Sequence, residues 1–261
     1  MDIVLQGAAL YPHIKDWNGT VDVHKLNLFQ MKRLVGLRSR ASLFKKLIKI
    51  MKREDPPVDL PAGLDPEQLD LIDFIHILVG IVAMSKGRQY QRTFTCPHCK
   101  KLNPRVLDLV KIFKFRKPKL VQPEVVNEKI DGQVIEVLPR NITVKDYITI
   151  QDKASALTVD SLKDDYNLDG DEEDVEDFAE SLVDIGLVSL ISDIKPAKTF
   201  EEKVLFFGSG RDEPVALYKK INAQVMQLSP DSDSDYTTSC SNCKKDIKVS
   251  IEASDYFFDL V

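Results

Sequence analysis

The sequence predicts an α+β fold in which two cysteine turns, far apart in the chain, close on one metal ion. The four cysteines of the chain form two Cys-x-x-Cys turns, which begin at Cys96 and Cys240. Alternating strand patterns flank the turns, whereas helical periodicity precedes the first turn and recurs between the two. We therefore expect N-terminal helices followed by zinc-ribbon-like β-hairpin knuckles closed by the four cysteines, with a β-hairpin and a large helical insertion between the knuckles.

The two cysteine turns resemble each other beyond the cysteines themselves. Each follows a polar approach that contains threonine, and each runs into two lysines, Lys100-Lys101 or Lys244-Lys245. Two such turns supply four thiolates, which complete a tetrahedral sulfur shell for Zn²⁺. Because four thiolates leave no open position for water, the zinc would be structural and would supply folding free energy. The predicted ligands are Cys96, Cys99, Cys240 and Cys243.

Other interpretations of the cysteines stay open. Cys96-Pro97-His98-Cys99 also fits a thiol oxidoreductase motif, and the four thiols could carry no ligand at all. The redox motif favours a cysteine at the start of a helix, whereas Pro104 favours a turn. A shell of three cysteines and His98 is a further variant. A secreted disulfide framework is not expected, because residues 1–7 lack the basic and apolar regions of a signal peptide.

Composition predicts a soluble protein with an uneven distribution of charge. The 261 residues are 43% hydrophobic, which is enough for a sizeable core in one large or two small domains. Net charge is −5, yet residues 15–53 hold eleven Lys or Arg against two Asp, and residues 160–184 hold twelve acids against one Lys. Such polarity predicts docking on the chain itself or on a partner. The most apolar stretch, residues 69–84, is too short and polar to span a membrane.

Hydrophobic periodicity predicts the order of the elements. Residues 1–24 show no regular pattern. The expected elements after them are a basic amphipathic helix over 26–51, a helix capped by Asp65 that ends by Gly87, a strand leading to the first turn, a strand over Val106–Lys114, a hairpin about Asp131-Gly132, a helix over 143–156, helices from Asp174 to Ile194, over 200–207 and over 214–228, and a last strand over Ile247–Ile251.

These elements group into four regions. The regions are an N-terminal segment with the basic helix (1–54), the capped helix with the first zinc knuckle and the β-hairpin (55–139), the acidic helical insertion (140–229), and the second knuckle with an aromatic C-terminus (230–261). Partner-binding residues are predicted on the basic helix and at the C-terminus: Lys45, Lys46, Lys49, Tyr256, Phe257 and Phe258. The basic helix could instead be a solvated surface helix, and the aromatic residues could fold back on the knuckles as core.

Two further features are interpreted as non-functional. Residues 165–176 fit the EF-hand loop pattern, but Glu172 stands where such loops need an apolar residue, and no second loop exists to pair with it. We predict no useful calcium affinity there. His76 lies in an apolar helix and is expected in the core. No nucleophile or phosphate-binding motif occurs in the sequence, so we expect neither enzymatic activity nor a small-molecule substrate.

The order of these features resembles the baseplate hub and hub-assembly proteins of contractile-tailed, T-even type bacteriophages. The resemblance covers about residues 55–261. It rests on the leucine-rich capped helix, Thr95-Cys96-Pro97-His98-Cys99, a hairpin ending at Leu138-Pro139, the acidic insertion, Cys240-Ser241-Asn242-Cys243 and Asp255-Tyr256-Phe257-Phe258. It implies a viral baseplate protein, either a structural subunit of the virion tail or an assembly factor in the host cytoplasm. Other hub or tail proteins would be its partners, with no membrane.

A zinc-ribbon nucleic-acid-binding accessory protein is the main alternative. Lysines beside the knuckles and basic residues over 111–119 could contact phosphate. Aromatic residues that could stack on bases are few in this region, mainly Phe113 and Phe115. Nucleic-acid binding is therefore not the expected function.

Overall fold

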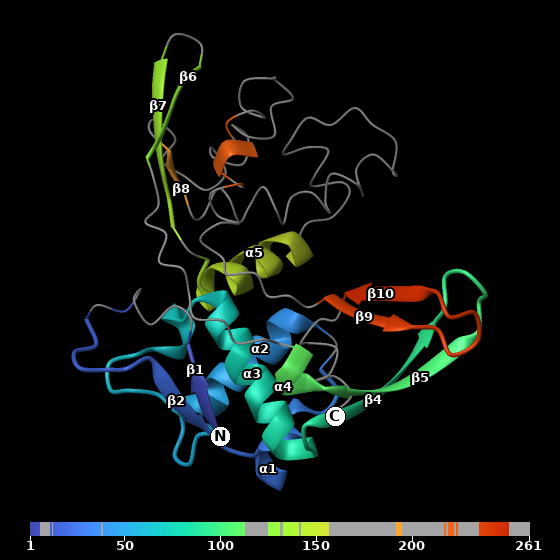
Figure 1. The fold of residues 1–261 in the computed structure, drawn as a ribbon. Coiled ribbons are helices and arrows are strands. Elements are labelled where there is room, and N and C mark those ends of the chain that lie inside the picture. Colours follow the sequence, from blue (N-terminus) through green and yellow to red (C-terminus); the bar gives the residue numbers. More distant parts are fainter. Residues whose placement is uncertain are drawn as a thin grey trace. The chain divides into compact units, whose positions relative to one another are not determined.

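The computed structural model describes residues 1–5, 11, 13–37, 39–112, 125–130, 133–140, 142–156, 192–194, 217, 219–221, 223 and 235–250. The chain forms two compact units, residues 1–118 with 230–261 and residues 119–229. Helices and small antiparallel sheets occur in the described parts of the chain, which confirms the predicted α+β class (Figure 1). The boundaries after residues 54, 139 and 229 stay predictions.

A three-stranded antiparallel sheet lies at the N-terminal end of the first unit. Its order is β1 (Asp2–Val4), β2 (Thr20–Val23) and β3 (Val58–Asp59). The expectation that residues 1–24 contain no regular element is wrong. The strands are so short that only a few residues alternate, such as Ile3 in the core, and a sequence pattern needs a longer run to be detected.

The expected single helix over residues 26–51 is two helices. Helix α1 covers Leu28–Leu34 and helix α2 covers Arg40–Met51. Between them the backbone of Gly36 has φ of 79°, a left-handed conformation that ends a helix and favours glycine. Ser39 then begins α2 by accepting a hydrogen bond from a backbone N–H in its first turn. The break lies at residues whose side chains do not disturb the apolar periodicity.

The predicted leucine-rich helix is present as α3 (Leu71–Lys86), preceded by a 3-10 turn, η2 (Pro66–Gln68). The expected cap, Asp65, accepts a hydrogen bond within the 3-10 turn, and a second aspartate, Asp70, caps α3 itself. No helix in the described part of the chain has the length and apolarity needed to cross a membrane.

Helix α3 is the centre of the first unit, beside β1 and β2 (Figure 1). A Cβ at Gly80 would lie only 2.1 Å from Ile3 Cδ1, so glycine is what permits this close approach of strand and helix. The buried Asp73 accepts a hydrogen bond from the Tyr11 hydroxyl at 3.3 Å, and burial together with this carboxylate raises the pKa of Tyr11. His76 is buried as expected, and burial lowers its pKa to about 4, so it stays neutral in the core.

Two β-hairpins of the first unit carry the cysteines. One consists of β4 (Gln89–Thr95) and β5 (Leu102–Asp108), and the other of β9 (Asp235–Ser239) and β10 (Asp246–Ser250). The predicted strand over Val106–Lys114 is only partly correct. Strand β5 starts earlier and gives way to a helical turn, α4 (Leu109–Ile112). The turn begins where Asp108 Oδ1 accepts a hydrogen bond from the backbone of Lys111 at 3.4 Å, a local contact that alternation does not reveal.

The second unit contains the predicted hairpin and the predicted helix. Strands β6 (Val126–Ile130) and β7 (Gln133–Pro139) pair antiparallel, and helix α5 covers Val144–Ala156. The predicted helical end at Ile194 is wrong, because β8 (Ser192–Ile194) is a strand that pairs with β7. Its three residues are too few to show a period of their own. The predicted helix over 200–207, the acidic loop 165–176, most of 214–228 and the aromatic residues Tyr256–Phe258 lie outside the described residues.

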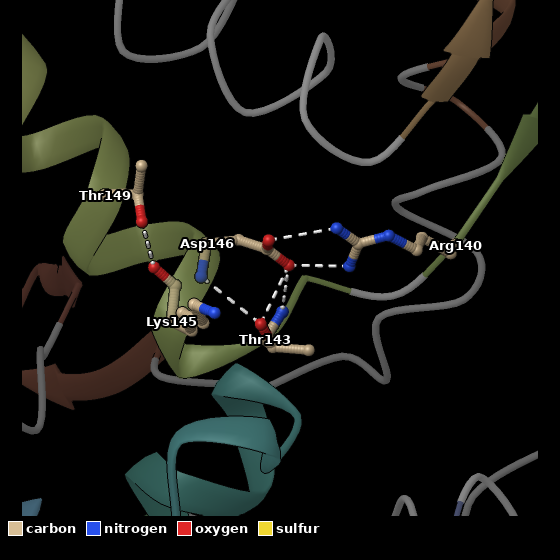
Figure 2. Close-up of polar contacts among 5 residues, drawn as sticks. All are labelled: Arg140, Thr143, Lys145, Asp146 and Thr149. Carbon is tan, nitrogen blue, oxygen red and sulfur yellow. Dashed lines mark hydrogen bonds and ion pairs between the residues drawn. The ribbon is translucent and has the colours of Figure 1, made fainter. Parts of the chain in front are cut away.

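Helix α5 begins with a charged cap (Figure 2). The Thr143 hydroxyl accepts a hydrogen bond from the backbone of Asp146 at 3.2 Å, and Asp146 Oδ2 accepts from the Thr143 N–H at 2.9 Å. The Arg140 guanidinium also donates two hydrogen bonds to Asp146, at 2.6 and 2.9 Å. Burial raises the pKa of Asp146, but the Arg140 and Thr143 bonds outweigh it and lower the pKa below its ordinary value. The arrangement is a capping box reinforced by an ion pair.

Candidate metal centre

The two cysteine turns have the same backbone structure. In the first, the Cys96 N–H donates to the Lys101 carbonyl at 2.9 Å, and the Lys100 N–H donates to the Cys96 carbonyl at 2.9 Å. In the second, the Cys240 N–H donates to the Lys245 carbonyl at 2.8 Å, and the Lys244 N–H donates to the Cys240 carbonyl at 3.1 Å. The strands that enter and leave the turns also pair in equivalent registers. The similarity seen in the sequence is therefore a similarity of structure.

A left-handed residue follows the second cysteine of each turn. The φ angles of Lys100 and Lys244 are 59° and 62°, in a region that favours glycine. A residue other than glycine in this conformation lowers the stability of the fold by about 1–2 kcal/mol, and a lysine takes this conformation at the same position in both turns. The turn conformation is thus imposed by the surrounding hydrogen bonds and not by the preference of the residue.

The four sulfur atoms form a compact cluster. Cys96 Sγ lies 3.7 Å from Cys243 Sγ, Cys99 Sγ lies 3.6 Å from Cys240 Sγ, and all four sulfurs lie within 4.8 Å of one another. In a tetrahedral shell with Zn–S bonds of about 2.3 Å, the sulfurs are roughly 3.8 Å apart. Both short contacts join sulfurs of different turns, as a shared shell requires. The four cysteines could therefore hold a metal ion such as zinc.

The surroundings of the sulfurs favour thiolate at Cys240 but not at Cys243. The backbone N–H groups of Cys243 and Asn242 point at Cys240 Sγ, at 3.5 and 3.4 Å, and these bonds lower the pKa of Cys240 to about 6. The backbone N–H of Lys245 lowers the pKa of Cys243, but burial and the neighbouring thiols outweigh it and raise that pKa to about 11. Four adjacent thiols ionise together only when a cation offsets their mutual repulsion. The chemistry of the donor set therefore fits a bound cation.

A buried asparagine joins the two turns. Asn103, on β5, is fully buried, and its Oδ1 accepts hydrogen bonds from the backbone N–H and the hydroxyl of Ser241, at 2.8 and 2.9 Å. Its Nδ2 donates to the Lys101 carbonyl at 2.8 Å. In the other hairpin the equivalent position, four residues after the last cysteine, is Ile247, which packs against Cys96 and Cys240. The two hairpins are therefore complementary rather than identical.

Further contacts hold the hairpins together along their strands. The Arg105 guanidinium donates to the Thr238 hydroxyl at 3.0 Å and to the carbonyl of Ser239. The rings of Phe94 and Tyr236 stack with their centroids 6.0 Å apart. Segments more than 130 residues apart in the chain are thus joined by side chains as well as by the sulfur cluster.

Sequence reasoning identified the cysteines but missed Asn103 and Arg105. Neither residue belongs to a spacing pattern, and a polar residue in a short strand is ordinarily exposed. Only the alignment of the two turns could have singled out Asn103, because it stands where the second turn has an apolar residue. His98 is exposed on its turn and is not among the clustered ligands.

The redox interpretation receives no support from the fold around the first turn. Cys96 follows strand β4 and Cys99 leads into strand β5, so neither cysteine stands at the start of a helix, where a thiolate of low pKa is ordinarily stabilised. The second turn has the same strand-to-strand setting.

The predicted partner-binding lysines lie on helix α2. Lys46 and Lys49 are exposed and Lys45 is partly buried. The helix buries its other side, where Leu43, Phe44 and Leu47 belong to the core. Both the docking interpretation and the interpretation as a solvated surface helix remain consistent with this placement. Tyr256, Phe257 and Phe258 lie outside the described residues, so their role stays a prediction.

One other group of possible ligands occurs in the described part of the chain. Asp22, His24 and Asp59 bring their ligand atoms within 4.8 Å of one another on the exposed side of the N-terminal sheet. His24 Nε2 lies 3.0 Å from Asp59 Oδ2, a contact that a surface ion pair explains fully. We assign no metal to this group.

Comparison with protein-family models, with curated proteins and with solved structures finds no match to this chain. The functional argument therefore depends on the residues of the chain itself.

Proposed function

We propose that the protein is a zinc-stabilised docking subunit that functions by binding other proteins. The observation that carries this proposal is the cluster of Cys96, Cys99, Cys240 and Cys243, with sulfur separations that fit tetrahedral zinc. Such a shell is closed, so the metal activates no water and serves the fold. In this proposal the hairpins form a zinc ribbon, and the unit at residues 119–229 is an insertion between its halves.

The charges beside the cluster support zinc as the resident ion. Four thiolates and one Zn²⁺ carry a net charge of −2, which neighbouring cations offset. Each turn contributes two exposed lysines to this environment, Lys100 and Lys101 from the first and Lys244 and Lys245 from the second. Their presence therefore has an explanation that requires no ligand outside the protein.

The sequence resemblance to contractile-tailed phage proteins supplies the class of partner. We propose a role in the tail baseplate hub, as a virion subunit or as an assembly factor, with other hub or tail proteins as partners. The uneven charge of residues 15–53 and 160–184 supports docking, because complementary charge steers association and fixes its register. No catalytic role accompanies this function.

The experiment has two parts. Mass spectrometry of purified virions should detect the protein if it is a retained subunit. Affinity purification from infected cells should recover tail-hub proteins with it if it is a subunit or an assembly factor. The baseplate role would be overturned if the protein were absent from virions and recovered no tail protein from infected cells. The zinc site is tested separately, by the metal content of the purified protein.

Nucleic-acid binding is the second candidate, and the exposed lysines beside the turns are the observation that favours it. Two of them already have partners, because Lys101 Nζ contacts Asn242 and Lys244 Nζ contacts the Ser241 carbonyl. Phe94, which could offer a stacking face, is buried against Tyr236. A DNA and RNA binding assay at several salt concentrations should show no affinity beyond weak, salt-sensitive association.

A further inference from the structure

Helix α1 exposes an unusual amount of apolar surface. Leu28, Phe29 and Val35 are 68%, 65% and 57% exposed, and they lie on or directly after this two-turn helix. The other side of the helix is anchored, because Leu34 is buried and Gln30 forms a capping box with Asn27. The helix is thus held firmly while three large apolar side chains face solvent.

A hollow of about 360 Å³ lies between α1 and the C-terminal end of α2, and Phe29 is the one of these three side chains that lines it. Its volume lies near the lower end of the range of ligand-binding pockets. Its lining combines an apolar part with two arginines and one acid, and includes Phe29, Gln30, Arg33, Ile50, Arg53 and Glu54.

The two arginines give the hollow its chemistry. The Arg33 guanidinium lies over the Phe29 ring, with its Cζ 4.5 Å from the ring centroid, which is the distance of a cation–π contact. Within the described residues, neither Arg33 nor Arg53 has a carboxylate within ion-pair distance. Guanidinium groups recognise carboxylates through paired hydrogen bonds. The hollow therefore offers an apolar floor with two available carboxylate-binding groups at its rim.

The net positive charge of residues 15–53 also favours a ligand that carries carboxylates. Residues 15–53 carry eleven basic side chains against two acidic ones, and Lys46 and Lys49 on α2 are exposed. A field of this sign attracts an acidic segment and repels a basic one.

We propose that this hollow binds an acidic peptide segment of a partner protein. One aromatic or branched aliphatic side chain of the segment packs against Phe29 and Ile50, and a neighbouring carboxylate accepts hydrogen bonds from Arg33 and Arg53. The inference rests on the proposed docking function and deepens it, because it names the surface and the chemistry of the partner. It also moves the expected contact from Lys45, Lys46 and Lys49 to the hollow that Arg33 and Arg53 line.

The test measures binding of a fluorescent synthetic peptide with one phenylalanine flanked by glutamates to the full-length, zinc-loaded protein. Arg33→Ala and Arg53→Ala should each weaken binding about tenfold or more, because each removes a charge-assisted hydrogen bond. Phe29→Ala, and alanine in place of the peptide's phenylalanine, should weaken it similarly. Lys46→Ala and Lys49→Ala remove the same charge outside the hollow, so they are matched controls and should change affinity by less than about threefold.

Several results would overturn the proposal. The proposal fails if the peptide does not bind at millimolar concentration. It also fails if the lysine controls lose as much affinity for the peptide as the arginine variants, because an equal loss indicates nonspecific charge attraction. Tighter binding of anionic vesicles or duplex DNA with the same dependence on Arg33 and Phe29 would assign the hollow to another ligand. The melting temperature of each variant should match the wild type, because Phe29 and Arg53 are exposed.

Recovery of tail-hub proteins separates this inference from the proposed function. If the Arg33→Ala and Phe29→Ala variants still recover tail proteins, docking uses another surface, and the inference fails while the function stands. If the wild type binds the peptide but recovers no tail protein, the baseplate role fails and the binding chemistry of the hollow stands.

Discussion

Replacing Asn103 tests whether the two cysteine turns depend on a polar connection as well as on the metal. Asn103→Ala removes three hydrogen bonds from a fully buried side chain. Ser241 is exposed, so its hydroxyl regains water, but its N–H loses its partner, whereas the Lys101 carbonyl keeps the hydrogen bond from the Cys96 N–H. At roughly 1–2 kcal/mol for the Ser241 N–H and up to about 1 kcal/mol for the bond lost to Lys101, the expected destabilisation is about 1–3 kcal/mol. In a unit of this size that corresponds to a decrease of about 3–10 °C in Tm.

Thermal unfolding followed by circular dichroism at a fixed free zinc concentration measures this effect, because bound metal itself shifts Tm. Asn242→Ala is the matched control. It removes the same side chain from an exposed position in the second turn, where a surface contact with Lys101 and a hydrogen bond to the Cys99 thiol are lost, and should cost less than about 1 kcal/mol. Equal stabilities of the Asn103→Ala and Asn242→Ala proteins would refute the reasoning.

Asn103→Asp separates hydrogen bonding from charge. The carboxylate can still accept from Ser241, but it cannot donate to the Lys101 carbonyl, and it adds a negative charge beside the proposed zinc–thiolate shell, whose own net charge would be −2. We expect this variant to be less stable than Asn103→Ala at pH 7. A stability equal to the wild type would show that the donor is unimportant.

Three other outcomes are expected. Cys96→Ser and Cys240→Ser should each abolish stoichiometric zinc binding and lower the Tm to a similar extent, because either substitution opens the same shell. Metal analysis and thermal unfolding measure the two effects. A strongly unequal effect of the two substitutions would contradict a shared site. Asp146→Asn should cost about 1–2 kcal/mol at pH 7, since Arg140 is partly exposed and its ion pair is screened. The pKa of Asp146 is lowered in the folded protein, so the stability that its carboxylate contributes is present above the unfolded pKa of about 3.9 and is lost as the pH falls through the folded pKa. Denaturant unfolding at pH 7 and pH 3 should therefore show that the difference in unfolding free energy between wild type and variant shrinks in acid. An unchanged difference would contradict this. Titration calorimetry should show no calcium site of micromolar or tighter affinity at residues 165–176, and such a site would show that the sequence pattern was judged wrongly.

The features that the sequence predicted best are those fixed by local spacing. The Cys-x-x-Cys turns, the hairpin of β6 and β7 and helix α5 each depend on residues a few positions apart, and each is present where expected. The sulfur cluster joins two such local features, and it was predictable because the two turns match. Thiolates in one turn need partners, and the second turn was the only other source of cysteines in the chain.

The features that the sequence missed depend on tertiary contacts or on very short elements. Strand β8 has three residues and is recognised only by its pairing with β7. The break between α1 and α2 occurs at Gly36, where the backbone changes direction without interrupting the apolar pattern. Asn103 bonds to residues of the second turn, and no pattern within its own strand identifies such partners. Sequence periodicity indicates which residues of one segment are buried. These features depend instead on contacts or backbone conformations that the periodicity of one segment does not show.

The metal content and the sulfur coordination of the purified protein test the central claim most directly. Native mass spectrometry combined with zinc-edge X-ray absorption should give one Zn²⁺ per chain with four sulfur ligands at about 2.3 Å and no nitrogen or oxygen ligand. Strong chelation should remove the ion and much of the structure of the first unit with it. A fully folded protein without metal, or a zinc shell containing nitrogen or oxygen, would contradict the account.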